Sequence, residues 1–144
     1  MNVLRKRFSM LGVTGAAVLS LLAVSGAVLG DEVKVSLSGA QEVPPVKTSA
    51  SGSGTIMINA DKSVSGSVTT TGVAGTAAHI HLAGAGKNGP VIVPLTKSGD
   101  NGWSVPAGAK LSDDQFKAYK AGDLYVNVHS AANKGGEIRG QLKP

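Results

Sequence analysis

Two short stretches of sequence, AAHIH at residues 77–81 and LYVNVH at residues 124–129, contain all three histidines of the chain. In a β-strand, the side chains of residues i and i+2 point to the same face. His79 and His81 therefore share one face of the first stretch, and Ala78 and Ile80 take the other. In the second stretch, Val126 and Val128 share one face, and Tyr125, Asn127 and His129 share the other. If the apolar faces are buried, all three imidazoles lie on the outer face of one region of a sheet.

The chain from Asp31 onward consists of short alternating segments separated by Gly, Ser, Asn and Pro. This period of two is typical of strands that bury one face. Pro44 and Pro45 interrupt the pattern, because neither nitrogen can donate to a strand ladder, so residues 39–51 are predicted to form a loop. Strands are predicted at residues 33–37, 54–59, 64–70, 77–81, 91–95, 124–129 and 137–142. Many short strands at this spacing predict an all-β fold, an antiparallel Greek-key β-sandwich.

One short helix is predicted at residues 111–120. Ser112 is a suitable N-cap, and Gln115, three residues later, completes a capping box. Gly122 is expected to end the helix. The one tryptophan, Trp103, is predicted to pack in the core, which is the usual role of such a large apolar side chain.

The last two predicted strands are expected to pair as an antiparallel hairpin across a turn rich in Asn, Lys and Gly. Ile138 and Leu142 would then face the core. Glu137 and Arg139 would lie on the outer, solvated face, on the same side as His129. Cross-strand charge pairing is the expected role of these two residues.

The first 30 residues are predicted to be a secretory signal peptide, followed by one domain at residues 31–144. Three basic residues at positions 5–7 precede an apolar, uncharged run over residues 10–29 that ends in small residues. An uncleaved membrane anchor is the alternative, since this run is nearly long enough to span a bilayer. Loss of the three basic residues would lower the formal net charge from +5 to +2. The mature domain is therefore expected to be periplasmic or secreted, with no membrane association after cleavage.

Composition excludes several classes of function. The basic character comes largely from the leader, and no basic run or aromatic platform favours nucleic acid as a partner. The serines lie in turns without a paired histidine and acid, so no nucleophilic triad is indicated. The chain has no cysteine, so stability must come from the core, or from the core and a bound metal. We therefore expect a binding protein rather than an enzyme.

The three histidines predict a metal site. Imidazole nitrogen suits copper, zinc, nickel and cobalt, and three imidazoles on neighbouring strands can reach one ion. A fourth position would be taken by water, Met57 or Glu137. The alternative is that His79, His81 and His129 are surface or packing residues that specify strand pairing.

Four motifs, taken together, resemble the CHRD domain, which is named after chordin and also occurs in many bacterial exported proteins. They are LSGAQEVPP at residues 37–45, AHIH at 78–81 with NGPV at 88–91, LYVNVHS at 124–130 and GGEIRGQL at 135–142. The resemblance covers residues 33–142. It implies an immunoglobulin-like, all-β sandwich in an extracytoplasmic setting. It implies no general activity, although chordin-type proteins bind growth factors.

A second resemblance concerns the histidines alone. Copper/zinc superoxide dismutases are also Greek-key sandwiches, and they bind copper through a His-x-His pair on one strand and a histidine on a later strand. His79, His81 and His129 are similar to that arrangement, which implies copper as the first choice and zinc as the second. The chain lacks a fourth histidine, a zinc-binding loop rich in His and Asp, and cysteines. The site is therefore expected to hold a metal rather than to turn over superoxide.

The sequence thus predicts an exported copper-binding protein for copper sequestration, delivery or resistance, with a copper-trafficking protein as a further partner. The alternative hypotheses are a structural or adhesive binding module without metal, and a dismutase-like metalloenzyme.

Overall fold

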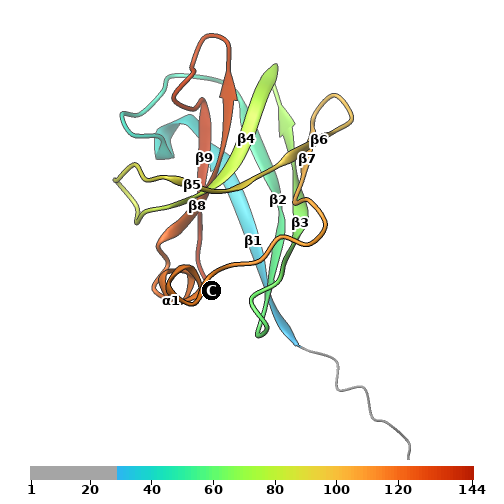
Figure 1. Cartoon of the computed structure of the whole chain (residues 1–144). Coiled ribbons are helices and arrows are strands. Elements are labelled where there is room, and N and C mark those ends of the chain that lie inside the picture. Colours follow the sequence, from blue (N-terminus) through green and yellow to red (C-terminus); the bar gives the residue numbers. More distant parts are fainter. Residues whose placement is uncertain (1–28) are drawn as a thin grey trace, which may run out of the picture.

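The computed structural model describes residues 29–144 and consists of strands with one α-helix (Figure 1). The predicted leader, apart from its last two residues, lies outside the described residues. The strands are β1 (Gly30–Ser38), β2 (Ser51–Asn59), β3 (Val64–Thr71), β4 (Gly75–Leu82), β5 (Val91–Pro94), β6 (Thr96–Ser98), β7 (Gly102–Ser104), β8 (Leu124–Ser130) and β9 (Ile138–Leu142). The helices are a 3-10 turn, η1 (Gly39–Gln41), and α1 (Asp113–Lys120).

The strands form one hydrogen-bonded sheet in the order β5-β4-β8-β9-β1-β2-β3-β7-β6. All of the strand pairs are antiparallel. The strand predicted at residues 91–95 corresponds to β5, which pairs with β4, but the strand that follows at once, β6, pairs with β7 at the opposite edge. Leu95 joins β5 to β6, and its backbone N–H donates to Ala78 O at 2.9 Å. Because one stretch of chain serves both edges, the sheet wraps round on itself, and the predicted all-β, antiparallel sandwich is confirmed.

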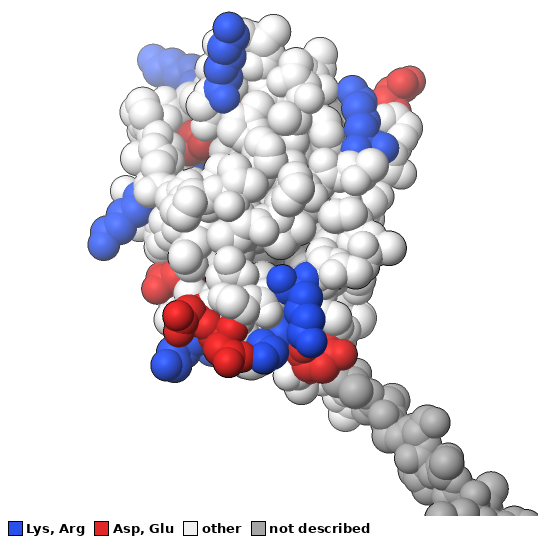
Figure 2. Space-filling model, viewed as in Figure 1, with Lys and Arg blue, Asp and Glu red and all other residues white. Residues whose placement is uncertain are grey.

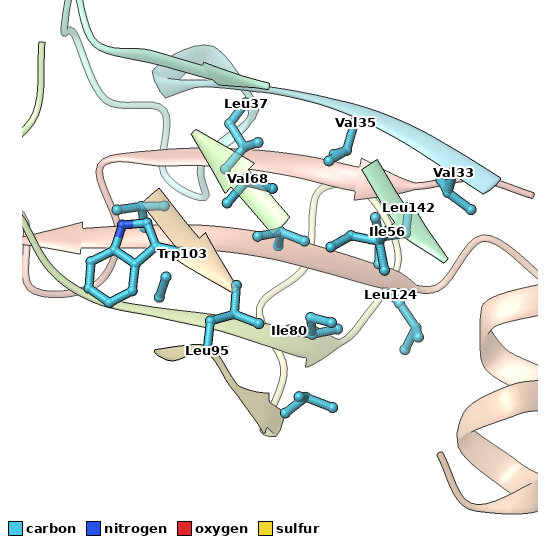
Figure 3. Packing of buried hydrophobic residues seen from close by; sticks show 14 of the residues in the cluster. Val33, Val35, Leu37, Ile56, Val68, Ile80, Leu95, Trp103, Leu124 and Leu142 are labelled. Atoms are coloured by element: carbon cyan, nitrogen blue, oxygen red, sulfur yellow. The ribbon is translucent and has the colours of Figure 1, made fainter. Parts of the chain in front are cut away.

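The core fills the space between the two layers of the wrapped sheet (Figure 3). Each layer contributes the apolar face predicted from its alternation, with Ile56 on β2, Ile80 on β4 and Val126 on β8 all at most 1% exposed. Trp103 is 4% exposed and packs in this core, as predicted. Burial of these side chains, worth roughly 1.5–3 kcal/mol each, stabilises a fold that has no disulfide.

Helix α1 begins after Ser112, two residues later than the predicted range, because residues 111 and 112 precede the first helical turn. The capping box is confirmed: Gln115 N–H donates to Ser112 Oγ at 3.1 Å, and Ser112 N–H donates to Gln115 Oε1 at 2.9 Å. At its other end, Tyr119 donates to Asp31 Oδ2 at 3.1 Å, and Lys120 pairs with the same carboxylate. These contacts fix α1 to the beginning of β1.

Charged side chains are unevenly spread over the face of the molecule shown in Figure 2. Positive and negative groups lie together at the end that carries α1, and most of the remaining face carries no charge. The face shown carries no extended basic surface. Within residues 29–144, none of the helices combines the length and the apolar character that a membrane span requires.

Candidate metal centre

The three histidines lie together on the outer face of β4 and β8, which are neighbours in the sheet. His79 pairs with Asn127 across the two strands, and His129 pairs with Ala77, so His129 is diagonal to His79. The centroids of the imidazole rings are 4.8 Å apart for His79 and His129 and 5.5 Å apart for His79 and His81. One ligand nitrogen from each ring lies within 4.8 Å of the other two. The strand pairing thus brings together the three side chains that the sequence selects.

Backbone carbonyls determine which nitrogen of two rings faces the cluster. His81 Nδ1 lies 2.9 Å from Gly89 O, and His129 Nδ1 lies 2.8 Å from Lys134 O. A carbonyl oxygen only accepts, so each Nδ1 carries the proton and each Nε2 keeps its lone pair. Metal-bound histidines show this same arrangement, in which the second ring nitrogen donates to a carbonyl or carboxylate.

The third ring, His79, presents Nδ1 to the cluster. His79 Nδ1 and His129 Nε2 are 3.0 Å apart. Because His129 Nε2 is an acceptor, His79 Nδ1 donates this hydrogen bond in the metal-free protein. Two nitrogens bound at 2.0–2.1 Å to one ion, at an angle of roughly 90–110°, would be about 2.8–3.4 Å apart. An ion could therefore take the place of this proton without separating the two rings, provided that His79 changes tautomer: Nδ1 releases its proton to solvent and Nε2 takes one up, so that the ring stays neutral.

His81 Nε2 is buried and has no hydrogen-bond partner among the described residues. A buried acceptor without a donor is costly, at about 1–3 kcal/mol. At the same ligand angles, two nitrogens bound to one ion lie at most about 3.4 Å apart. The longest separation in the cluster is 4.8 Å and involves His81, so it would need to shorten by roughly 1.4 Å when an ion binds. A buried lone pair in this position is what a metal ligand would present.

The environment keeps two of the rings neutral, which metal binding requires. Burial lowers the pKa of His79, and the neighbouring His129 and His81 lower it further. Burial is also the main reason that the pKa of His81 is lowered, although its hydrogen bond to Gly89 opposes this shift. Neutral imidazoles hold their lone pairs ready for a cation.

The face of β8 and β9 beside the histidines is buried. The prediction that Arg139 lies on a solvated face was therefore wrong. Tyr125 and Asn127 are each 2% exposed, and Arg139 is 1% exposed. The Tyr125 ring stacks on His81, with centroids 4.8 Å apart and an interplanar angle of 3°. The Arg139 guanidinium carbon lies 3.4 Å from the centroid of the Tyr125 ring. Arg139, Tyr125 and His81 thus form one stack that supports the site from the side.

The loop at residues 83–90 covers this stack and explains the burial. Arg139 donates to Lys87 O at 2.8 Å and to Gly84 O at 3.1 Å. Gly89 N–H donates to the Tyr125 hydroxyl at 3.2 Å, while Gly89 O accepts the His81 proton. The expected pairing of Arg139 with Glu137 is therefore replaced by hydrogen bonds from Arg139 to this loop.

Glu42 is a buried carboxyl that the sequence did not single out for any chemistry. It is 4% exposed, and its Oε1 has no hydrogen-bond partner among the described residues. Burial raises the pKa of Glu42 to about 7, against the opposing effects of the Arg139 charge and of a contact with Asn127. Glu42 also lines a cavity of about 530 Å³ between the loops at residues 42–47 and 133–136.

Neither side chain predicted as a fourth ligand belongs to the cluster. Met57 lies on β2, which three strands separate from β4, and it pairs there with Glu32 and Ser65. The Glu137 carboxylate instead accepts from Thr48 Oγ1 at 2.7 Å. Hydrogen bonds from Ser130 and Thr48 lower the pKa of Glu137 and hold it ionised in that position.

The supporting residues carried little signal in the sequence. Tyr125 and Asn127 were assigned correctly to the face of His129, but nothing in the alternation shows that a loop covers that face. The glycine-rich segment at residues 83–90 reads as a flexible connection, whereas its carbonyls bind Arg139 and His81. A clue was available in Arg139 itself, since a planar cation beside an aromatic residue on the next strand favours stacking.

Comparison with known protein families covers nearly the whole domain. The family model described as the CHRD domain matches residues 33–142, which is most of the chain. Neither a search of the curated proteins nor a search of the solved structures finds a significant match. The family is an extracellular type of β-domain, in agreement with the all-β fold found here. The chain therefore belongs to the CHRD-domain family.

Proposed function

We propose that this protein binds a transition-metal ion, copper in the first place and zinc as the alternative, through His79, His81 and His129. The observation that carries the proposal is the fixed orientation of the rings. Carbonyl oxygens hold the protonated Nδ1 of His81 and His129, so that the two Nε2 lone pairs and His79 Nδ1 converge. Surface histidines that only specify strand pairing would not need this arrangement.

The role that fits such a site is copper sequestration, delivery or resistance outside the cytoplasm, in the periplasm or after secretion. The extracellular type of the domain and the predicted leader support this location. A copper-trafficking protein would be the partner that supplies or receives the ion. The half-buried positions of His79 and His129 leave one side of the site open for water or for such an exchange.

The test is a titration of the full-length chain with Cu(II), Cu(I) and Zn(II). The triple variant His79→Ala/His81→Ala/His129→Ala should lose the tight site. A matched triple variant, Lys47→Ala/Lys87→Ala/Lys134→Ala, alters three exposed side chains of the surrounding loops and should bind like the wild type. Equal, weak binding by the wild type and the histidine variant would refute the proposal.

A binding module without metal is the second candidate, and the cavity beside Glu42 is the observation that favours it. Its lining combines the Val43–Val46 segment, amide groups and Lys47, so it offers both apolar and polar contacts. The same titration separates the two candidates, because a non-metal module gives no difference between wild type and the histidine variant. A dismutase-like activity would require superoxide turnover above that of free copper.

A further inference from the structure

Asn127 lies beside the proposed ligands without being one of them. It pairs with His79 across β4 and β8, and it shares the face of His129. Its side chain also contacts His81 on one side and Glu42 on the other. Asn127 therefore connects the histidine cluster with the buried carboxyl.

Two acceptor atoms meet at this point without a donor. His81 Nε2 keeps a lone pair because its Nδ1 proton is donated to Gly89 O. The Asn127 Oδ1 atom is also buried, and neither atom has a hydrogen-bond partner within the described part of the chain. A buried acceptor that lacks a donor is unfavourable, because the atom has lost its hydrogen bonds to water. An ion bound to His81 Nε2 would satisfy that atom, but in the metal-free protein the nitrogen needs a hydrogen-bond donor instead.

Rotation of the Asn127 amide by about 180° supplies this donor, because it exchanges the positions of the amide oxygen and nitrogen. The nitrogen can then donate to His81 Nε2. It gives up a long hydrogen bond of 3.4 Å to Gly135 O, which is close to the limit for such a bond, and its contact with the Glu42 carboxyl. The oxygen turns toward Glu42, whose carboxyl has a pKa of about 7 and so retains a proton to donate over much of the range up to neutrality.

We propose that Asn127 competes with the metal ion for His81 Nε2: its amide holds this lone pair in the metal-free protein and turns away when an ion binds. The inference rests on the proposed function, since it concerns the same three histidines. Asn127 is then a positioning residue that lowers the affinity of the site. A site with a built-in competitor favours exchange of the ion, and hence delivery, over permanent storage.

The direction in which one substitution changes the Zn(II) affinity tests this proposal. Asn127→Leu keeps the size of the side chain but removes the competing donor, so the full-length variant should bind Zn(II) about fivefold more tightly than the wild type, the value of one ordinary hydrogen bond. A purely structural Asn127 predicts the opposite, because disruption of the site weakens binding. The matched control is Asn59→Leu at the distant β2–β3 turn, where Asn59 donates to Ser63, and its affinity should equal that of the wild type. Unchanged or weaker binding by a folded Asn127→Leu chain would overturn the proposal.

A second measurement on the wild type does not depend on whether the variant folds. In the metal-free, ¹⁵N-labelled chain, NMR should detect a scalar coupling across the hydrogen bond from Asn127 Nδ2 to His81 Nε2. The coupling should disappear when Zn(II) is added. A chain that binds Zn(II) but never shows the coupling contradicts the proposal.

The two proposals fail in different ways. Failure of the metal site appears as weak binding by the wild type and every variant. Failure of the Asn127 proposal appears in a chain that binds Zn(II) normally, as an unchanged affinity or an absent coupling.

Discussion

In the site, two backbone carbonyls determine the tautomer and the orientation of two histidine rings. His81 and His129 each donate one proton to a loop carbonyl, and this leaves one nitrogen of each ring as an acceptor aimed at the cluster. Alternation along two strands was enough to predict that the three rings share a face. It was not enough to predict the carbonyls, because both come from loops whose path depends on the finished fold.

Glu42 provides a prediction at the scale of one residue. Burial raises its pKa from 4.5 to about 7. A carboxyl whose pKa is higher in the folded state contributes its full stability below pH 4.5, and this contribution is lost as the pH rises through 7. The loss amounts to at most about 3 kcal/mol. Glu42→Gln, which is neutral at every pH, should therefore lose less stability than the wild type between pH 5 and pH 8.

Urea unfolding of both proteins at pH 5 and pH 8 checks this expectation. The wild type should have the larger decrease in free energy of unfolding between the two pH values. If both proteins show the same decrease, Glu42 is not the group responsible.

At the scale of elements, the helix and seven of the nine strands described in residues 29–144 follow from the sequence, whereas the short strands β6 and β7 were not predicted and the loops decide the site. Period-two alternation located the seven predicted strands, and Ser112 with Gln115 located the beginning of α1 to within two residues. The division of residues 91–98 between two edges was not predictable, because it depends on how the sheet wraps. The burial of Arg139 was missed for a related reason: the loop at residues 83–90 that covers it carries no apolar pattern.

The turn between β8 and β9 provides a prediction at this scale. Gly136 has a φ of +128°, and a Cβ there would lie 2.5 Å from Glu42 Oε1 and 2.6 Å from Asn127 Nδ2. Gly136→Ala should therefore lower the free energy of unfolding by about 2 kcal/mol or more, from backbone strain and steric overlap. The same turn carries Lys134 O, which orients His129, so Zn(II) affinity should also fall.

The neighbouring glycine is the matched control. A Cβ at Gly135 would meet open space, so Gly135→Ala should change stability by less than about 1 kcal/mol. Urea unfolding and Zn(II) titration of both variants make the comparison. Equal effects of the two substitutions would contradict the account of Gly136.

At the scale of the whole molecule, the sheet supplies a rigid frame and three loops complete the site. Segments at residues 42–47, 83–90 and 131–137 are distant in sequence, but Asn88 donates to Val43 O at 2.7 Å, and Arg139 next to the last segment binds the second. Family membership fixes the all-β, extracellular type of domain. The chemistry of the site instead depends on how these particular loops meet the histidine face.

The most direct test of the metal site is a crystal structure of the copper-loaded protein, with anomalous diffraction measured at the copper edge. The account predicts one strong anomalous peak about 2.0–2.2 Å from each of three atoms, His79 Nδ1, His81 Nε2 and His129 Nε2. No peak among these histidines, or a peak bound to other residues, would contradict it.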